Sequence, residues 1–223
     1  ILKGHVSLGS LRVRQDILIA EGLLSPFTGD ERASTDAEAM ALARIRQLSA
    51  HEVGHTLGIG HNYIASTQGR ASVMDYPAPL VTLATDGRVD LTRAYAVGIG
   101  DWDKVAVTWG YQDFPDGTDE PAALEQILSA SRARGLTFLT DQDARPTGSA
   151  HPETHLWDNG TDAAMELDRV MQVRARAMRL FGETAIRTGQ PLALMEKAFV
   201  PLYLHNRYQV EAAVKLVDGT WYS

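Results

Sequence analysis

Apolar residues recur at helical spacing over long stretches of the chain and alternate with polar residues in only a few short ones. In the clearest stretch, residues 35–57, the apolar side chains repeat with the period of a helix: Met40, Ala41, Leu42, Ile45, Leu48 and Val53. The sequence T-D-A-E from Thr35 has the spacing of a capping box, so we expect this helix to begin there. Its apolar residues fall on more than one face, which predicts cover from a sheet as well as from helices.

The remaining pattern also favours helices. Alternation predicts short strands at residues 4–8 and 136–140, whereas glycine and proline punctuate residues 60–100 and indicate a long irregular segment, which is typical of a functional loop. Further helices are expected over residues 11–24, 101–111, 119–134, 162–187 and 191–216, with a bend in the last at Pro201. The predicted fold class is therefore α+β, mostly α-helical.

The composition is that of a globular protein. Hydrophobic residues make up 44% of the 223 residues, and 21 basic against 28 acidic residues give a net charge of −7. An acidic chain with no basic cluster argues against nucleic acid or an anionic membrane as a partner. Since the chain has no cysteine, disulfides and thiolate metal ligands are excluded.

Residues 51–61 read H-E-V-G-H-T-L-G-I-G-H and carry the chemistry. His51 and His55 are four residues apart, so on a helix both imidazoles lie on one face and can bind the same zinc ion. Glu52 lies about 100° round the helix, beside the metal rather than on it, where it can act as a base towards a zinc-bound water.

His61 can join this site only if the helix ends before it, because ten helical residues would carry it about 15 Å beyond His51. Gly58 and Gly60 can adopt the positive φ that stops a helix and reverses the chain. Three histidines would then leave the fourth zinc position for water, as a catalytic site requires. The alternative is that these histidines are only hydrogen-bonded side chains on a core helix.

A second segment, S-V-M-D-Y-P, follows at residues 72–77. Together the two segments resemble the metzincin clan of zinc peptidases, which has an extended zinc helix and a methionine turn beneath the metal. The resemblance implies that His51, His55 and His61 bind one zinc ion, with Met74 as the floor beneath them. It implies Glu52 as the general base, and Tyr76 matches a tyrosine that some metzincin families place near the metal or the oxyanion.

More narrowly, the chain looks like the C-terminal part of a family of large bacterial zinc-dependent metallopeptidases. The stretches that carry this likeness are LRVRQD, HEVGHTLGIGHN, SVMDYPAP, GSAHPETHLWDNG and LYLHNRYQVEAA. It implies a catalytic core over residues 1–115, with the zinc helix at about 35–57 and the methionine turn at 72–76, and a helical C-terminal part over residues 116–223 packed on that core. By the same likeness we expect a periplasmic or secreted protein.

Metzincin catalytic domains normally place more strands and helices before the zinc helix than fit in the residues preceding His51. The chain also begins with Ile1 rather than Met. We therefore expect an N-terminal subdomain that is incomplete in this piece, with an exposed apolar patch or edge strand near residues 1–10. Such an edge predicts self-association, and the strand over residues 4–8 is a candidate edge for pairing with an extended substrate.

Two weaker signals have ordinary explanations. His151 and His155 also have i, i+4 spacing, with Asp143 and Asp158 nearby, but loop histidines around Pro152 explain them without a second metal.

A calcium site is not expected either. The acidic residues near Gly117 show no EF-hand spacing and fit a solvated turn with a helix cap: Asp116, Asp119 and Glu120.

The sequence thus predicts a zinc metallopeptidase that hydrolyses peptide bonds with a water activated by Glu52. Two alternatives remain open at this point. One is an inactive or partly active zinc-containing binding module; the other is a zinc amidase that acts on small substrates.

Overall fold

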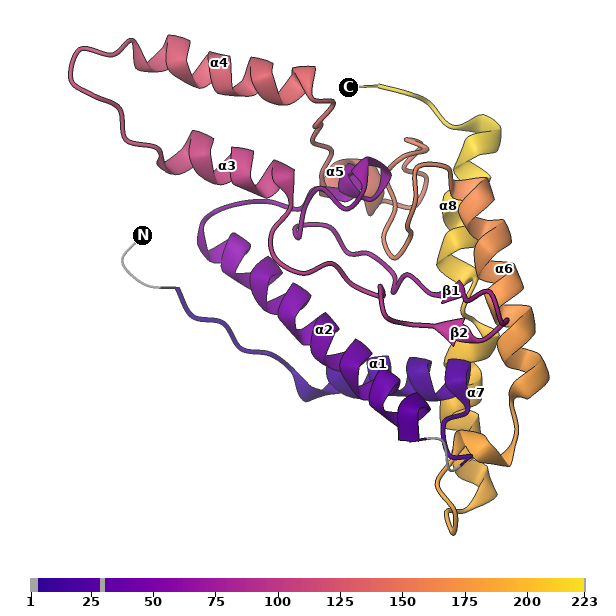
Figure 1. Cartoon of the computed structure of the whole chain (residues 1–223). Coiled ribbons are helices and arrows are strands. Elements are labelled where there is room, and N and C mark those ends of the chain that lie inside the picture. The colour runs from indigo at the N-terminus through magenta and orange to yellow at the C-terminus, as the bar shows by residue number, and fades with distance from the viewer. Residues whose placement is uncertain (1–3, 29–30, 223) are drawn as a thin grey trace.

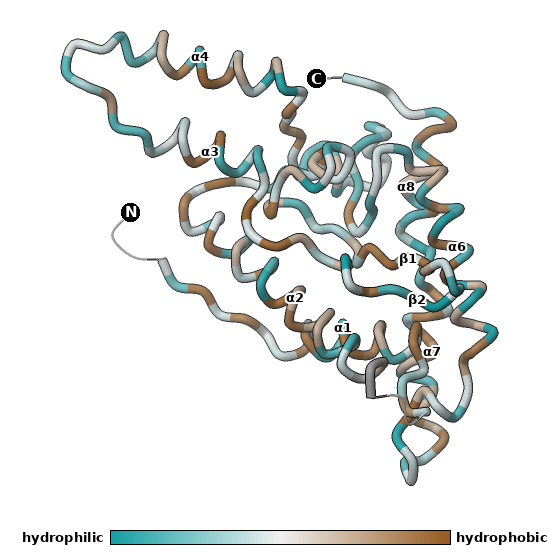
Figure 2. Tube along the Cα trace, viewed as in Figure 1, coloured by the Kyte–Doolittle hydropathy of each residue, from teal (hydrophilic) through white to brown (hydrophobic). Residues whose placement is uncertain are grey.

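The longest element is helix α2, Glu31–Thr56, which ends within the histidine motif of residues 51–61. In the computed structural model, which describes residues 4–28 and 31–222, α2 packs along α1, Ser10–Leu24 (Figure 1). Hydrophobic and hydrophilic residues are interspersed along α2 (Figure 2), and Met40 and Ala41 on this helix are buried. Leu42 and Val53 are exposed, with 44% and 50% of their surface accessible.

The main core lies between the N-terminal and C-terminal helices. Ala20 and Leu23 of α1 and Met40 of α2 meet Val173 of α6 and Leu202 of α7 there. Helix α6 spans Ala163–Leu180, α7 spans Met195–Tyr203 and α8 spans Arg207–Asp218; two 3₁₀ turns, η2 (Glu183–Ala185) and η3 (Leu192–Leu194), join α6 to α7.

The segment after α2 crosses the front of this core with little regular structure. It contains the 3₁₀ turn η1, Tyr63–Gln68, and an antiparallel pair of two-residue strands, β1 (Thr82–Leu83) and β2 (Val89–Asp90). This agrees with the irregular stretch predicted over residues 60–100. A pair of helices, α3 (Asp101–Tyr111) and α4 (Glu120–Ala133), then projects away from the body, and the short helix α5, Asp141–Ala144, returns the chain to the centre (Figure 1).

Neither predicted strand forms. Residues 4–9 have no helix or strand in the described part of the chain, because no neighbouring strand pairs with their backbone. Residues 136–140 satisfy their backbone groups differently. The carbonyl of Leu139 accepts from Tyr63 N (2.9 Å), while its N–H and the carbonyl of Thr137 bond to the Asn62 side chain (3.3 and 3.0 Å).

The N-terminal edge strand is thus replaced by an extended segment. Residues 1–3 of the expected apolar edge lie outside the described residues. Within residues 4–11 the large apolar side chains are exposed, with Leu11 78% accessible. Gly4 lies against Thr56, since a Cβ added at Gly4 would be 2.8 Å from Cβ of Thr56. This segment therefore starts beside the end of α2.

Several helix limits also differ from the prediction. Helix α2 begins at Glu31, so Thr35 lies within the helix and does not cap it. The helix predicted over residues 162–187 ends at Leu180, and the one predicted over 191–216 is divided after Tyr203 into α7 and α8. Pro201 lies inside α7, two residues before that break. A proline cannot donate the helical hydrogen bond at its own position, which weakens the helix there.

None of the helices in the described part of the chain is both long enough and apolar enough to cross a membrane.

Candidate metal centre

Three imidazole rings converge at the end of α2. His51 is fully buried, and His55 and His61 are half-buried. Nε2 of His55 lies 3.1 Å from Nε2 of His51 and 3.1 Å from Nε2 of His61. Tetrahedral zinc with Zn–N bonds of about 2.0–2.1 Å separates two of its nitrogen ligands by about 3.3 Å. The spacing of the three nitrogens therefore suits one zinc ion.

The chain reverses between the second and third histidines through a Schellman motif. Ile59 N donates to the carbonyl of Gly54 (3.1 Å) and Gly58 N to that of His55 (3.0 Å). Gly58 has φ of +83°, the left-handed conformation that glycine adopts without strain. Helix α2 thus ends at Thr56, before His61, as the motif predicts; Gly60 is not in the left-handed region.

Hydrogen bonds fix which nitrogen of each ring faces the centre. Nδ1 of His51 lies 2.7 Å from the carbonyl oxygen of Val73, and Nδ1 of His55 lies 2.9 Å from that of Ile59. A carbonyl only accepts, so each Nδ1 carries the proton and each Nε2 has a lone pair. Nδ1 of His61 likewise meets the Asp141 carboxylate, at 2.8 Å.

Three inward lone pairs cannot bond to one another and repel unless a cation lies among them. This donor set, three neutral imidazoles without sulfur, is one that zinc prefers. Burial is the main reason that the pKa of His51 falls to about 4, and the neighbouring His55, His61 and Arg44 lower it further against the opposing effect of the Val73 carbonyl. His51 is therefore neutral near pH 7 and ready to bind metal.

Asp141, the first residue of α5, holds the ring of His61 from behind. Tyr63 donates to its carboxylate from the hydroxyl (3.2 Å), and Nε of Arg145 donates to that hydroxyl (2.8 Å). Burial by itself raises the pKa of Asp141, but the hydrogen bond from His61 and the charges of His61 and Arg145 lower it below its usual value. An ionised carboxylate on Nδ1 fixes the orientation of the ring and raises its basicity towards a metal.

The methionine turn packs directly on the zinc helix. Met74 is 1% exposed, and a Cβ added to Gly54 would lie 2.2 Å from its sulfur. Only a glycine on this turn of α2 therefore allows the approach of the sulfur. The peptide N–H of Met74 is held by Oγ of Ser72 at 2.9 Å, and its carbonyl accepts from Asn62 N at 3.1 Å.

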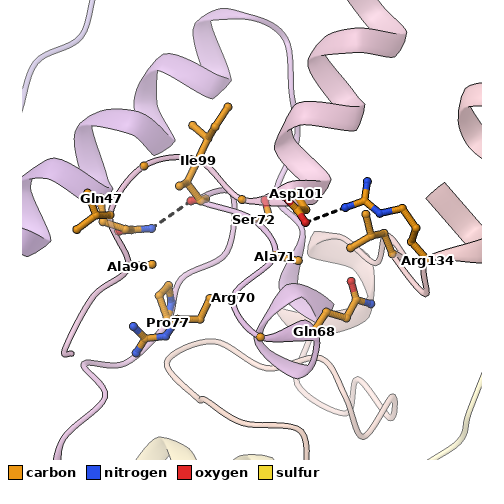
Figure 3. Close-up of a pocket in the computed structure, with 16 residues that line it drawn as sticks. Gln47, Gln68, Arg70, Ala71, Ser72, Pro77, Ala96, Ile99, Asp101 and Arg134 are labelled. Carbon is orange, nitrogen blue, oxygen red and sulfur yellow. Dashed lines mark hydrogen bonds and ion pairs between the residues drawn. The ribbon is translucent and has the colours of Figure 1, made fainter. Parts of the chain in front are cut away.

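The neighbouring residue Val73 links the methionine turn to α2 and α3 through its backbone. Its carbonyl accepts from His51 and from Nε2 of Gln47 (3.1 Å), both on α2. Its N–H donates to the buried carboxylate of Asp103 on α3, at 2.8 Å. Figure 3 shows Gln47 reaching this turn at the wall of a cavity of 670 Å³, which Ser72 also lines. The position of His51 thus depends on α3 through the backbone of one residue, Val73.

Tyr76 lies over the imidazoles. Its ring centroid is 4.5 Å from that of His51, 5.0 Å from that of His61 and 5.4 Å from that of Trp157. Burial and, after it, the negative charge of Glu52 raise the pKa of the Tyr76 hydroxyl. The hydroxyl is therefore protonated at neutral pH and can donate a hydrogen bond.

The other predicted residues have structural partners outside this centre. Nε2 of His151 lies 3.0 Å from the carbonyl of Tyr222, and Nε2 of His155 lies 3.5 Å from the Glu211 carboxylate. Asp119 caps α4 by accepting from Ala122 N at 3.2 Å, as the cap interpretation predicts. Among the described residues, His51, His55 and His61 form the one group of at least three potential metal ligands. Their ligand atoms all lie within 4.8 Å of one another.

Sequence reasoning missed the supporting residues, which are far from the motif. Asp141 is 80 residues from His61 and Asp103 is 30 residues from Val73. The stretch HLWDNG, part of the family likeness, has no role that its own sequence indicates. It pairs with the residues after the methionine turn, as Trp157 N donates to the Tyr76 carbonyl at 2.8 Å.

Comparison with known proteins gives one match. A family model described as Met-zincin matches residues 33–223, which include the three histidines and the methionine turn. No curated protein and no solved structure matches the chain.

Replacing Gly54 with alanine is expected to destabilise the protein by about 1–3 kcal/mol, because the new methyl group would overlap the sulfur of Met74. Gly60→Ala is the matched control, since its Cβ would meet nothing nearer than Oγ1 of Thr140 at 3.9 Å. Urea unfolding of both variants measures the difference. Equal stability of the two would show that the sulfur does not pack against Gly54.

Asp141→Asn is expected to weaken zinc binding by about 10- to 100-fold, because the amide is neutral and orients His61 less well. Competition with a chromogenic chelator measures the affinity. Asp143→Asn serves as the control on the same short helix, where its carboxylate accepts from Thr140 N (3.1 Å) and contacts no imidazole of the centre. Unchanged zinc affinity in Asp141→Asn would show that this carboxylate does not support metal binding by His61.

Proposed function

The chain belongs to the Met-zincin family, and on that premise we propose that it is a zinc-dependent metallopeptidase whose zinc is held by His51, His55 and His61. The observation that carries the proposal is the convergence of three unprotonated Nε2 atoms. Family membership supports peptides as the substrates.

A zinc ion bound at this centre supplies a Lewis acid that lowers the pKa of a water molecule and polarises the scissile carbonyl. The protein's own residues then move the protons. Glu52 follows His51 directly on α2 and is half-buried, and its negative charge acts on Tyr76, whose ring lies over the imidazoles. We assign to it the removal of the proton from the attacking water and the delivery of that proton to the leaving amine.

Tyr76 has the properties of an oxyanion donor. Its ring contacts two of the three imidazoles, and burial with the charge of Glu52 keeps its hydroxyl protonated. A donor fixed in place before the reaction stabilises the negative charge that develops on the carbonyl oxygen.

We propose that the two parts of the chain, residues 1–115 and 116–223, build this site together. The first part supplies the histidines, Glu52 and Tyr76. The second supplies Asp141, which bonds to His61, and Trp157, whose ring meets that of Tyr76. The C-terminal part is then needed for metal affinity as well as for the fold.

A zinc-containing binding module and an amidase for small substrates are the competing functions. Glu52 and the protonated hydroxyl of Tyr76 favour an enzyme over a binding module, since neither is needed to hold the metal. Cleavage of an unselected unfolded protein distinguishes a peptidase from an amidase that takes only small amides.

Glu52→Gln is expected to keep zinc and fold while hydrolysis falls by about 10²- to 10⁴-fold, because the amide cannot accept the water's proton. Glu38→Gln, at an exposed position of the same helix, should leave the rate unchanged. Steady-state cleavage of a quenched fluorescent peptide measures both. A rate in Glu52→Gln close to that of the parent would assign the base to another residue.

Tyr76→Phe is expected to lower kcat by up to about 10²-fold with KM nearly unchanged, because the hydroxyl acts on the transition state rather than on the bound substrate. The same peptide assay gives both constants. A raised KM with an unchanged kcat would instead make Tyr76 a substrate-binding residue.

Self-association is expected from the exposed apolar side chains before and at the start of α1, such as Leu8 and Leu11. Sedimentation velocity over a range of concentrations measures it. Leu11→Asp should shift the protein towards monomer, whereas Leu192→Asp, at a residue 60% exposed on η3, should not. A parent protein that is monomeric throughout contradicts the expectation.

A further inference from the structure

A cavity of 690 Å³ lies between α1, α7 and the start of α8, beside the residues that follow the methionine turn. We call it the Trp157 cavity, and its lining includes Arg14, Pro79, Trp157, Lys197, Arg207 and Tyr208. Its volume is within the range of ligand pockets in proteins. Its floor is apolar, with Leu18 and Ile19 of α1 facing Val200 of α7.

The cavity begins close to the metal centre. The ring centroid of Tyr76 lies 4.5 Å from that of His51 and 5.4 Å from that of Trp157, which lines the cavity. The backbone of Tyr76–Ala78 is bonded to that of Trp157–Asp158, through Trp157 N to Tyr76 O (2.8 Å) and Ala78 N to Asp158 O (3.2 Å). An extended peptide advances about 3.3 Å per residue, so these two ring-to-ring distances place the Trp157 ring no farther from the His51 ring than the length of about three residues.

The charge of the cavity is opposite to that of the whole chain. Arg14, Lys197 and Arg207 line it with one acidic residue, Glu196, in a protein whose net charge is −7. Within the described residues none of these three cations forms an ion pair with a carboxylate; Arg207 instead lies over the ring of Tyr208, with Cζ 4.1 Å from the ring centroid. Their positive charge is therefore available to a ligand.

We propose that the Trp157 cavity is the subsite that selects acidic side chains of the peptide substrate, within about three residues of the scissile bond. This inference rests on the proposed peptidase function and adds a substrate class to it. Guanidinium groups bind carboxylates with paired hydrogen bonds, and the apolar floor accommodates the methylene groups of glutamate.

The cations are exposed, so their effect is modest and depends on salt. An attraction that is equal in the ground state and the transition state changes KM rather than kcat. Acidic peptides should therefore bind more tightly at low salt and be cleaved at the same maximal rate as neutral ones.

Binding of labelled peptides to zinc-loaded Glu52→Gln tests the inference without turnover. The probes share one alanine-rich sequence and carry a run of Glu, Gln or Lys, and fluorescence anisotropy gives Kd for each. The Glu peptide is expected to bind about five- to tenfold more tightly than the Gln peptide at low salt, with the preference lost at high salt. Equal Kd values for the Glu and Gln peptides, or no binding of the Glu peptide, would overturn the proposal.

Reversing the charge of residues that line the cavity tests whether the cavity causes the preference for the Glu peptide. Arg14→Glu with Arg207→Glu, added to Glu52→Gln, is expected to invert the preference towards the Lys peptide. Both residues are exposed on helix surfaces, and a glutamate at the first position of α8 suits the helix dipole. Arg93→Glu with Arg179→Glu changes the net charge equally at exposed residues that do not line the cavity, and should keep the Glu preference. Equal effects of the two pairs would overturn the assignment.

The two proposals fail in different ways. If zinc-loaded parent protein cleaves neither peptide although the Glu peptide binds preferentially, the peptidase function is wrong and the binding site for acidic side chains stands. If the parent cleaves the Glu and Gln peptides with the same kcat/KM at low salt, the subsite is wrong and the peptidase function stands.

Discussion

The arrangement of the metal centre follows from one electrostatic constraint. Each imidazole donates a hydrogen bond from Nδ1, so three Nε2 lone pairs point at the same small volume, with Nε2 of His55 3.1 Å from that of each of the other two. That arrangement is favourable only around a cation. Three features bring the nitrogens together. Gly58 in the left-handed conformation returns the chain so that His61 reaches the other two histidines. The Val73 carbonyl orients His51, and the Asp141 carboxylate orients His61.

These supports come from segments far apart in the chain, which explains why the metal centre and the fold depend on each other. Asp103 on α3 accepts a hydrogen bond from the N–H of Val73, and the carbonyl of the same residue orients His51. Asp141 on α5 holds His61, and Trp157 pairs with Tyr76. A bound metal therefore joins α2, the methionine turn and the C-terminal part, and binding energy at the metal becomes folding energy for all three.

What the sequence could predict was local. Helical spacing placed most helices, and the glycine after His55 predicted the end of α2, because both depend on near neighbours in the chain. The prediction of strands at residues 4–8 and 136–140 was wrong, because a strand needs a partner strand that the alternation of residues does not reveal. The second segment bonds to the side chain of Asn62 instead. Asp103 and Asp141 carry no local motif, so only the fold brings them to the centre.

The central claim is that three imidazole nitrogens hold one zinc ion. X-ray absorption at the zinc edge, combined with metal analysis after dialysis, tests it most directly on the parent protein and on His55→Ala. The account predicts about one zinc per chain in the parent, with nitrogen or oxygen ligands at about 2.0–2.1 Å, a clear imidazole signature and no sulfur, and loss of the metal in the variant. A parent protein that retains no zinc, or a His55→Ala protein that retains it with an unchanged ligand shell, would contradict the claim.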